Sequence, residues 1–227
     1  MEKKTGKTIF IVTGGPMGDR GFLQSQIRER KPHMVICADG GIRHLAHLGI
    51  APQVLIGDMD SLDTNLLSKW QGEKIKVLRH PPDKKETDTE LALNYAFDAK
   101  PRQIDFFGAL GARIDHSLAN IALLVRCKEK NIKAKILDEW CELYLADRET
   151  IIEGEVGQTV SLLPLGDRVR GINLQGFVYP LNEGEMRLGF PYGISNRLQE
   201  KRGVISVKEG NLLVIHFRFP DRFPQGS

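Results

Sequence analysis

Aspartates follow four consecutive short apolar runs of the chain, and their positions are the clearest chemical signal in the sequence. Asp39 follows the second run, Asp58 and Asp60 follow the third, and Asp88 and Asp115 lie beyond the fourth and fifth. If these runs are parallel strands, their carboxyl ends form one edge of a sheet, where open α/β sheets bind ligands. Carboxylates gathered there repel one another, and a divalent cation such as Mg²⁺, which prefers oxygen ligands, relieves that repulsion. The pattern therefore predicts a magnesium site.

Asp58 and Asp60 form the sharpest local pair. In an extended chain, residues two apart face the same side, with α-carbons about 6.6 Å apart, so the two carboxylates can share one ion or bracket two. An Asx turn after a strand is the alternative interpretation of this segment when it is taken alone. Asp39-Gly40-Gly41 and Thr87-Asp88 occupy equivalent positions after other runs, and together they favour the metal site.

A glycine loop before a predicted helix indicates phosphate binding. Gly108 and Gly111 lie in this loop, and Arg113 follows them. Backbone N–H groups and the positive end of a helix attract phosphate, and a guanidinium adds a bidentate partner. His116 and Asn120, four residues apart, share one face of the helix.

Two further features of the phosphate site follow from the sequence. Gly40 lets a ligand approach the backbone closely. Lys85, two residues before Thr87, is a better phosphate candidate than Lys84, which we interpret as part of a solvated charged loop. The chain contains neither a G-x-x-x-x-G-K-[ST] nor a G-x-G-x-x-G sequence, so a nucleotide would be held by neither fingerprint.

The apolar runs alternate with helical patterns over the first 140 residues, which is typical of βαβ units and a mostly parallel sheet with flanking helices. The predicted strands are Thr8–Val12, Met34–Ala38, Val54–Ile56, Ile75–Leu78, Ile104–Phe107 and Ala134–Leu137. The predicted helices are Gly21–Glu29, Ile42–Leu48, Thr64–Trp70, Asp88–Ala99 and His116–Lys130. Thr87 and Glu90 form a capping box, and Gly49 is a natural helix stop.

The pattern changes after Cys141, where short strands are separated by Gly, Asn and Asp. The predicted strands are Glu142–Ala146, Thr150–Glu153, Thr159–Pro164, Val169–Leu174, Glu185–Phe190, Gly203–Lys208 and Leu212–Phe219. This spacing favours a smaller antiparallel β-sandwich, and Glu209-Gly210-Asn211 predicts a hairpin turn. We therefore predict an α/β chain with two domains, residues 1–140 and 141–227.

Composition excludes several classes of protein. With 41% hydrophobic and 27% charged residues, the chain is not expected to be disordered, and a net charge of +3 does not suggest a nucleic-acid surface. No apolar run approaches the roughly 20 residues of a membrane span or the about 7–15 of a signal peptide. The three cysteines have no C-x-x-C spacing and indicate buried, reduced thiols in a cytoplasmic protein.

Five segments, in this order, resemble the thiamine pyrophosphokinase family in its bacterial form. They are Ala38–Gly41, Gly57–Ser61, Lys85–Asp88, Gly108–His116 and Gly193–Asn196. The resemblance implies a transferase, a kinase that moves a diphosphoryl group from ATP to the hydroxyethyl oxygen of thiamine and yields thiamine diphosphate and AMP. It also implies an ATP- and Mg²⁺-binding first domain, a thiamine-binding second domain, and a homodimer whose active sites combine the first domain of one chain with the second domain of the other.

The resemblance also assigns roles to individual residues. Asp58, Asp60 and Asp88 would hold Mg²⁺, Asp39 would be a further ligand or support them, and one of these carboxylates would take the alcohol proton. The ATP-binding residues would be Gly40, Lys85, Thr87, Gly111, Arg113, Asp115, His116 and Asn120. Ser61 would line the thiamine site, and Ser195 and Asn196 would bind the aminopyrimidine. Some family members stack thiamine on a tryptophan of the second domain. Here Trp70 and Trp140 lie at or before the boundary, so another side chain must cover the ring.

Two other functions compete with this one. A glycosyltransferase would use Asp58 and Asp60 to bind a nucleotide-sugar through a metal, but it leaves Arg113, Asp115 and His116 without a role. A non-catalytic nucleotide or thiamine sensor has no need of mutually repelling carboxylates. Turnover, and release of AMP rather than a nucleoside diphosphate, distinguishes the three.

Overall fold

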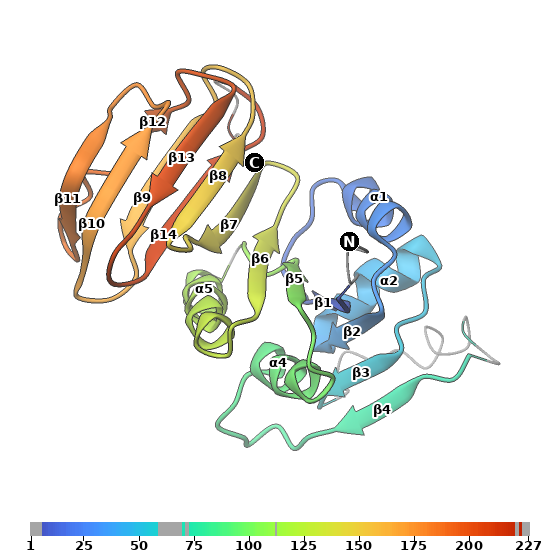
Figure 1. Cartoon of the computed structure of the whole chain (residues 1–227). Helices are drawn as coiled ribbons and strands as arrows, with labels where there is room; N and C mark the ends of the chain where they lie inside the picture. Colours follow the sequence, from blue (N-terminus) through green and yellow to red (C-terminus); the bar gives the residue numbers. More distant parts are fainter. Residues whose placement is uncertain (1–5, 59–69, 71–72, 112, 221–222, 224–227) are drawn as a thin grey trace. The chain divides into compact units, whose positions relative to one another are not determined.

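The computed structural model describes residues 6–58, 70, 73–111, 113–220 and 223, and the chain divides into two compact units, Met1–Glu139 and Trp140–Ser227. Figure 1 shows the first unit with helices around its sheet and the second built from strands. The predicted site residues Asp60 and Ser61, and all of the predicted helix Thr64–Trp70 except Trp70, lie outside the described residues.

A parallel sheet forms the centre of the first unit, as predicted. Its strands are β1 (Thr8–Val12), β2 (Met34–Ala38), β3 (Val54–Gly57), β4 (Lys76–Arg79), β5 (Gln103–Phe107) and β6 (Lys133–Leu137). They run in the order β6-β5-β1-β2-β3-β4, with every pairing parallel. The chain adds strands on one side of β1 and then on the other, so β1 and β5 mark the switch point where such sheets bind ligands.

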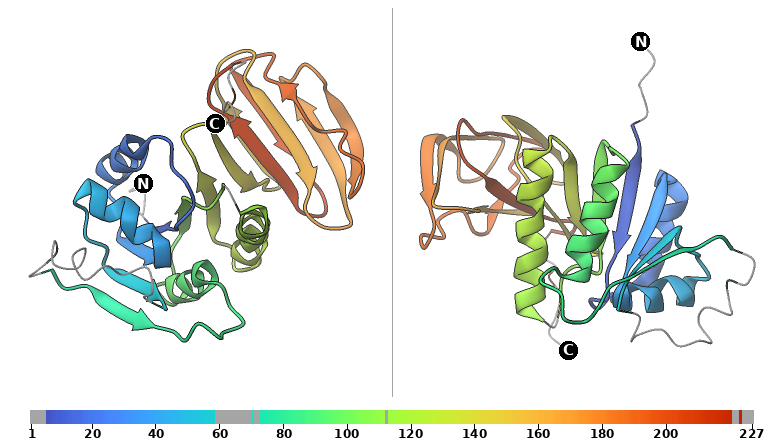
Figure 2. Two further views of the ribbon diagram at one scale, coloured as in Figure 1. Left: turned by 180° about the vertical axis from the view of Figure 1, so that it is seen from behind. Right: turned by 90° about the horizontal axis from the view of Figure 1, so that it is seen from below.

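Helices cover both faces of this sheet. They are α1 (Arg20–Arg30), α2 (Ile42–Leu48), α4 (Asp88–Asp98) and α5 (Ile114–Glu129). α2 packs against β1 and α1, whereas α4 packs against β1–β3 on the other face and contacts α5 (Figure 2). Because helices lie on both faces, most central strand residues are buried, which explains why these strands read as continuous apolar runs. None of the described helices could cross a membrane.

Local sequence signals place the helix ends. Thr87 Oγ1 accepts a hydrogen bond from the backbone N–H of Glu90 (3.1 Å), as the capping box predicts. α2 ends at Gly49 in the left-handed conformation (φ 67°), also as predicted. α5 begins at Ile114, two residues before its predicted start at His116, and lacks a side-chain cap.

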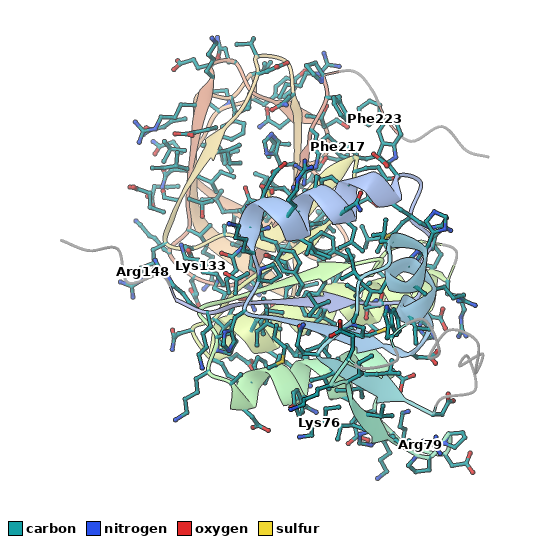
Figure 3. All side chains as sticks on the ribbon, turned by 90° about the vertical axis from the view of Figure 1, so that its right-hand side faces the viewer. Lys76, Arg79, Lys133, Arg148, Phe217 and Phe223 are labelled. Carbon is teal, nitrogen blue, oxygen red and sulfur yellow. The ribbon has the colours of Figure 1, made fainter. Side chains whose placement is uncertain are left out.

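The outer strand β4 forms an edge of the sheet, and its charged side chains protect that edge from pairing with other strands. It is mostly exposed, and it carries Lys76 and Arg79 at that edge (Figure 3). The Nζ atom of Lys76 lies 4.9 Å from the ring centroid of Tyr95. Charged side chains on an edge strand discourage pairing with the strands of other molecules.

The second unit contains two antiparallel sheets around one core, which confirms the predicted sandwich. Its strands are β7 (Cys141–Leu145), β8 (Glu149–Glu153), β9 (Thr159–Pro164), β10 (Arg168–Gln175), β11 (Leu181–Arg187), β12 (Asn196–Arg197), β13 (Arg202–Ser206) and β14 (Leu212–Phe217). Within this unit the orders are β12-β9-β14-β7 and β11-β10-β13-β8. Val160, Leu162 and Val214 of the first sheet share a buried cluster with Ile172 and Ile205 of the second.

Two predictions in this unit are wrong. Glu209-Gly210-Asn211 does not close a hairpin, because β13 pairs with β10 and β8 whereas β14 pairs with β7 and β9. The turn instead carries the chain from one sheet of the sandwich to the other. The strand predicted at Glu185–Phe190 instead spans Leu181–Arg187, and the chain turns at residues 188–189.

Candidate active site

A cavity of about 580 Å³ opens at the carboxyl ends of the parallel strands. The loops after β1, β2, β3 and β5 line it, together with the first turns of α4 and α5, so all of its lining residues belong to the first unit. This volume lies within the range of about 300–1,000 Å³ that is usual for small-molecule sites.

Three of the predicted metal-binding carboxylates line this cavity. Asp39 follows β2, Asp58 follows β3, and Asp88 is the first residue of α4. Asp39 has a left-handed backbone (φ 36°), an uncommon conformation outside glycine that often marks functional loops. A Cβ placed on Gly57 would lie 3.1 Å from Cβ of Asp39, so the ends of β2 and β3 almost touch.

The donor set of this wall suits a hard cation, because the carboxylates present only oxygen. Among the described residues, no three histidine, cysteine or acidic side chains are arranged to hold a metal ion. Asp39, Asp58 and Asp88 nevertheless line the same cavity, and Asp60 follows Asp58 by two residues. The described residues therefore fit Mg²⁺ in donor chemistry and common location.

Lys84 occupies the place that sequence reasoning gave to Lys85. Its Nζ lies 2.5 Å from Oδ1 of Asp88, and both side chains line the cavity. Lys85 is exposed and is not among the lining residues. Thr87 lines the cavity while its hydroxyl caps α4. The charged sequence around Lys84 is typical of a solvated loop. The sequence does not show the backbone path of residues 80–87, which turns Lys84 toward the cavity.

At the start of α5, Asp115 orients Arg113. Arg113 donates from Nε to Oδ1 (3.1 Å) and from Nη2 to Oδ2 (2.5 Å) of Asp115. This charge-assisted hydrogen bond lowers the pKa of Asp115 to about 2. Arg113 and His116 line the cavity, whereas Asp115 does not. Both members of the ion pair are more than half exposed, so its value here is orientation rather than stability.

Side chains of α5 hold the glycine loop against the helix. Asn120, which is buried, donates from Nδ2 to the carbonyl oxygen of Ala109 (2.8 Å). Ser117 Oγ accepts from the backbone N–H of Gly111 (3.0 Å). Asn120 and Gly111 also line the cavity, and their contacts with ATP stay a prediction. The observed contacts show that Asn120 also fixes the loop.

Sequence reasoning missed the loop after β1. Thr13, Gly14, Gly15 and Pro16 line the cavity, and the backbone N–H of Gly15 donates to the carbonyl oxygen of Gly108 (2.8 Å). The signal was present, because Thr13-Gly14-Gly15-Pro16 follows a buried strand just as Asp39-Gly40-Gly41 does. Residues 13–16 contain no aspartate, so the positions of carboxylates could not identify this part of the cavity lining.

The i, i+3 spacing of His44 and His47 predicts an exposed helix surface, but His44 is buried beneath that loop. Its Nε2 donates to the carbonyl oxygen of Gly15 (2.8 Å). Burial lowers the pKa of His44 below its usual value; the hydrogen bond to Gly15 opposes this, and the charges of Arg20 and Arg43 add to it. His44 therefore supports the loop through its hydrogen bond to Gly15. The i, i+3 pairing with His47 gave no sign of this, since α2 buries more than one face.

In the second unit, Asn196 is buried and fixes the position of an exposed aromatic residue. Its Oδ1 accepts from the backbone N–H of Tyr179 (3.1 Å), and its Nδ2 donates to the carbonyl oxygen of Tyr179 (2.9 Å). Tyr179 itself is 67% exposed. Ser195 is exposed, and its backbone N–H donates to Ser161 Oγ (3.0 Å). The sequence motif identified Ser195 and Asn196 but not Tyr179, whose backbone Asn196 holds.

Two exposed aromatic rings lie on the same unit. Phe190 and Tyr192 stack with ring centroids 5.9 Å apart and an interplanar angle of 28°. Exposed stacked rings are a ready surface for a planar aromatic ligand.

Comparisons with known proteins agree with both units. The family described as "Thiamin pyrophosphokinase, catalytic domain" matches residues 28–136, and "Thiamin pyrophosphokinase, vitamin B1 binding domain" matches residues 148–212. The chain is 32% identical over 211 residues to "Thiamine pyrophosphokinase" of Bacillus subtilis, covering 92% of this chain and 98% of that protein.

Solved structures show the same similarity. The crystal structure of the Bacillus subtilis thiamine pyrophosphokinase has a TM-score of 0.83 at 31% identity, covering 94% of this chain and 100% of that one. The Geobacillus thermodenitrificans thiamin pyrophosphokinase has a TM-score of 0.78 at 28% identity, with 94% and 99% covered. Because the two family models match residues 28–136 and 148–212 and the Bacillus subtilis relative is 32% identical over 92% of this chain, the chain belongs to the thiamine pyrophosphokinase family.

Proposed function

We propose that this protein transfers a diphosphoryl group from ATP to the hydroxyethyl oxygen of thiamine, giving thiamine diphosphate and AMP, and that it requires Mg²⁺. The observation that supports this most is that one cavity gathers Asp39, Asp58 and Asp88 with Lys84 and Arg113. Negative groups for a cation and positive groups for phosphate are the combination that phosphoryl-type transfer needs. The protein would be located in the cytoplasm, where its buried free cysteines stay reduced.

The reaction joins the thiamine hydroxyl oxygen to the β-phosphorus of ATP. The bond from the β-phosphorus to the oxygen that bridges to the α-phosphorus breaks, and AMP leaves with that oxygen. One carboxylate of the cavity takes the hydroxyl proton. Because no covalent intermediate is required, the protein contributes alignment and charge neutralisation.

Asp58, Asp60 and Asp88 would hold the magnesium ion, with Asp39 beside them. When bound, the ion supplies positive charge to the phosphate oxygens. The ammonium group of Lys84 lies 2.5 Å from Asp88. If Asp88 held a cation, this ammonium group would be released from the ion pair and could bind phosphate in the same cavity. Arg113, oriented by Asp115, would bind phosphate oxygens near the positive end of α5.

Thiamine would bind through the second unit. It has an aminopyrimidine ring and a positively charged thiazolium ring, each planar and aromatic, and exposed aromatic side chains attract such rings by stacking and cation–π contact. Tyr179 is the leading candidate to cover the ring, because Asn196 holds its backbone at both the N–H and the carbonyl group. In this proposal Asn196 acts on thiamine mainly through Tyr179. The active protein would be a homodimer in which each site takes residues from both chains.

The first experiment is to incubate the purified protein with ATP, Mg²⁺ and thiamine and to resolve the products. Equal amounts of AMP and thiamine diphosphate, absent when Mg²⁺ is chelated, would support the reaction and the metal requirement. ADP with thiamine monophosphate would overturn the diphosphoryl assignment. Thiamine binding without turnover would instead favour the sensor.

A complementation experiment tests the shared site. Asp60→Asn removes a carboxylate of the first unit, and Tyr179→Ala removes an aromatic side chain of the second; we expect each variant alone to lose most activity. If sites combine two chains, refolding the variants together restores about a quarter of the sites, because a mixed dimer contains one site with both changes and one with neither. No recovery from mixtures that form dimers would contradict the shared site. Near-normal activity of Asp60→Asn would contradict the metal assignment.

A further inference from the structure

Arg43 lines the cavity, although no sequence motif singled it out and none of the functional roles above includes it. It lies in the first turn of α2, yet its guanidinium folds back over the loop after β2. The Nη2 atom lies 2.9 Å, and Cζ 3.7 Å, from the point where a Cβ on Gly40 would be. The missing side chain of Gly40 therefore leaves the space through which this guanidinium reaches the cavity wall.

Arg43 differs from Lys84 and Arg113 in whether its charge is paired with a carboxylate. Lys84 is paired with Asp88 at 2.5 Å, and Arg113 is paired with Asp115 through two hydrogen bonds. Over the described ranges, no carboxylate lies within ion-pair distance of Arg43. Its donors therefore remain available on a wall that also carries Asp39 and Gly40.

We propose that Arg43 is a phosphate-binding residue of this cavity, which grips the phosphate oxygens of the nucleotide on the β2 side of the site. A guanidinium presents five N–H donors in a planar fork that matches two phosphate oxygens, whereas an ammonium acts as a point charge. Gly40 leaves the adjoining backbone open, so a phosphate can contact Arg43 and the loop together. The proposal rests on the proposed function, in that it takes the ligand to be a nucleoside triphosphate.

The test compares Arg43→Ala and Arg43→Lys with the control Arg102→Ala, which removes an exposed guanidinium just before β5, at the opposite end of the strands. Binding of α,β-methylene-ATP is measured by calorimetry with Mg²⁺ over a series of salt concentrations. We expect Arg43→Ala to weaken binding about tenfold or more and to reduce its salt dependence, because a hydrogen-bonded charge contact is lost. Arg43→Lys should recover part of the affinity, and Arg102→Ala should match the wild type.

The outcomes separate this proposal from the proposed function. Unchanged affinity and salt dependence in Arg43→Ala overturn the role of Arg43, even if the wild type forms thiamine diphosphate. Weaker binding with an unchanged salt dependence also overturns it, since that result indicates a structural role. An Arg43-dependent affinity in a wild type that forms no thiamine diphosphate supports Arg43 and overturns the proposed function. A wild type that does not bind the analogue overturns both.

Discussion

Lys84 and Lys85 are adjacent in the sequence and have different surroundings. Lys84 contacts Asp88 on the cavity wall, and Lys85 is exposed outside it. Residue types and spacing located Asp39, Asp58 and Asp88, because each of them follows a strand or begins a helix that the apolar pattern already marks. The same reasoning could not choose between two neighbouring lysines in a segment without regular structure, because the path of the backbone decides that choice.

Lys84→Met is therefore expected to lower kcat/KM for thiamine diphosphate formation about a hundredfold, the scale of losing one charged group at a phosphate. Lys85→Met, with the same change in composition one residue away, is the matched control and should retain activity. Steady-state kinetics with varied ATP measure both. A larger loss in Lys85→Met than in Lys84→Met would contradict the placement of these side chains.

His44 predicts a dependence of stability on pH. Burial lowers its pKa in the folded protein, so below the unfolded value of about 6.5 the unfolded chain binds a proton more readily. Stability is then full above that pH and falls as pH drops toward the folded pKa, by up to about 1.4 kcal/mol per pH unit. Urea unfolding of the wild type and His44→Gln from pH 8 to pH 5 measures this. Equal pH slopes for the two proteins would show that His44 is not the responsible group.

At the scale of elements, the loops after β1 and β5 meet backbone to backbone. A Cβ added to Gly15 would lie 2.3 Å from the carbonyl oxygen of Gly108 and 2.6 Å from that of Leu110. The hydrogen bond from Gly15 to Gly108 spans the same contact. These two loops therefore form one wall of the cavity, and neither can move without displacing the other.

Gly15→Ala is expected to cost about 1–3 kcal/mol of stability and to weaken ATP-analogue binding, because the clash is with backbone that cannot rotate away. Gly18→Ala in the same loop is the control, since its new Cβ would meet only the flexible end of Glu139. Thermal unfolding and calorimetry compare the two variants. A Gly15→Ala protein as stable as Gly18→Ala would show that the loops separate easily.

An element can be predicted from the sequence where its position depends on residues that are close together in the chain. The strands of the first unit were predicted to within a residue at each end, because each contains a short apolar run, and in the central strands burial on both faces makes that run uninterrupted. The C-terminal end of α2 was predicted from Gly49 and the N-terminal end of α4 from Thr87, because capping depends on residues next to the helix end. The partner of a strand is not local, so the turn at Glu209–Asn211 was wrongly taken to close a hairpin.

At the scale of the whole molecule, each unit has its own core. Phe177 is buried in the core of the second unit, whereas Phe106 is buried in the first. All of the residues that line the cavity belong to the first unit. The capacity to bind nucleotide should therefore depend on the first core alone, a division that the change of sequence pattern near residue 140 already suggested.

Phe177→Ala is expected to destabilise the second unit by about 3–5 kcal/mol and to leave ATP-analogue affinity unchanged at temperatures where the first unit is folded. Phe106→Ala, the same change in the first unit, should weaken that affinity. Calorimetry of binding and of thermal unfolding gives both quantities. Equal losses of affinity in the two variants would show that the units fold as one.

The wall made by the loops at Gly15 and Gly108 has a consequence for engineering this protein toward another nucleotide. Main-chain atoms form much of that wall, and a substitution changes a side chain but leaves the main-chain groups in place. A designer who wants a different base or a longer phosphate chain has little to mutate there. The adjustable surface is the set of side chains that project from α2, α4 and α5, so a library of variants gains most from diversity on those three helices.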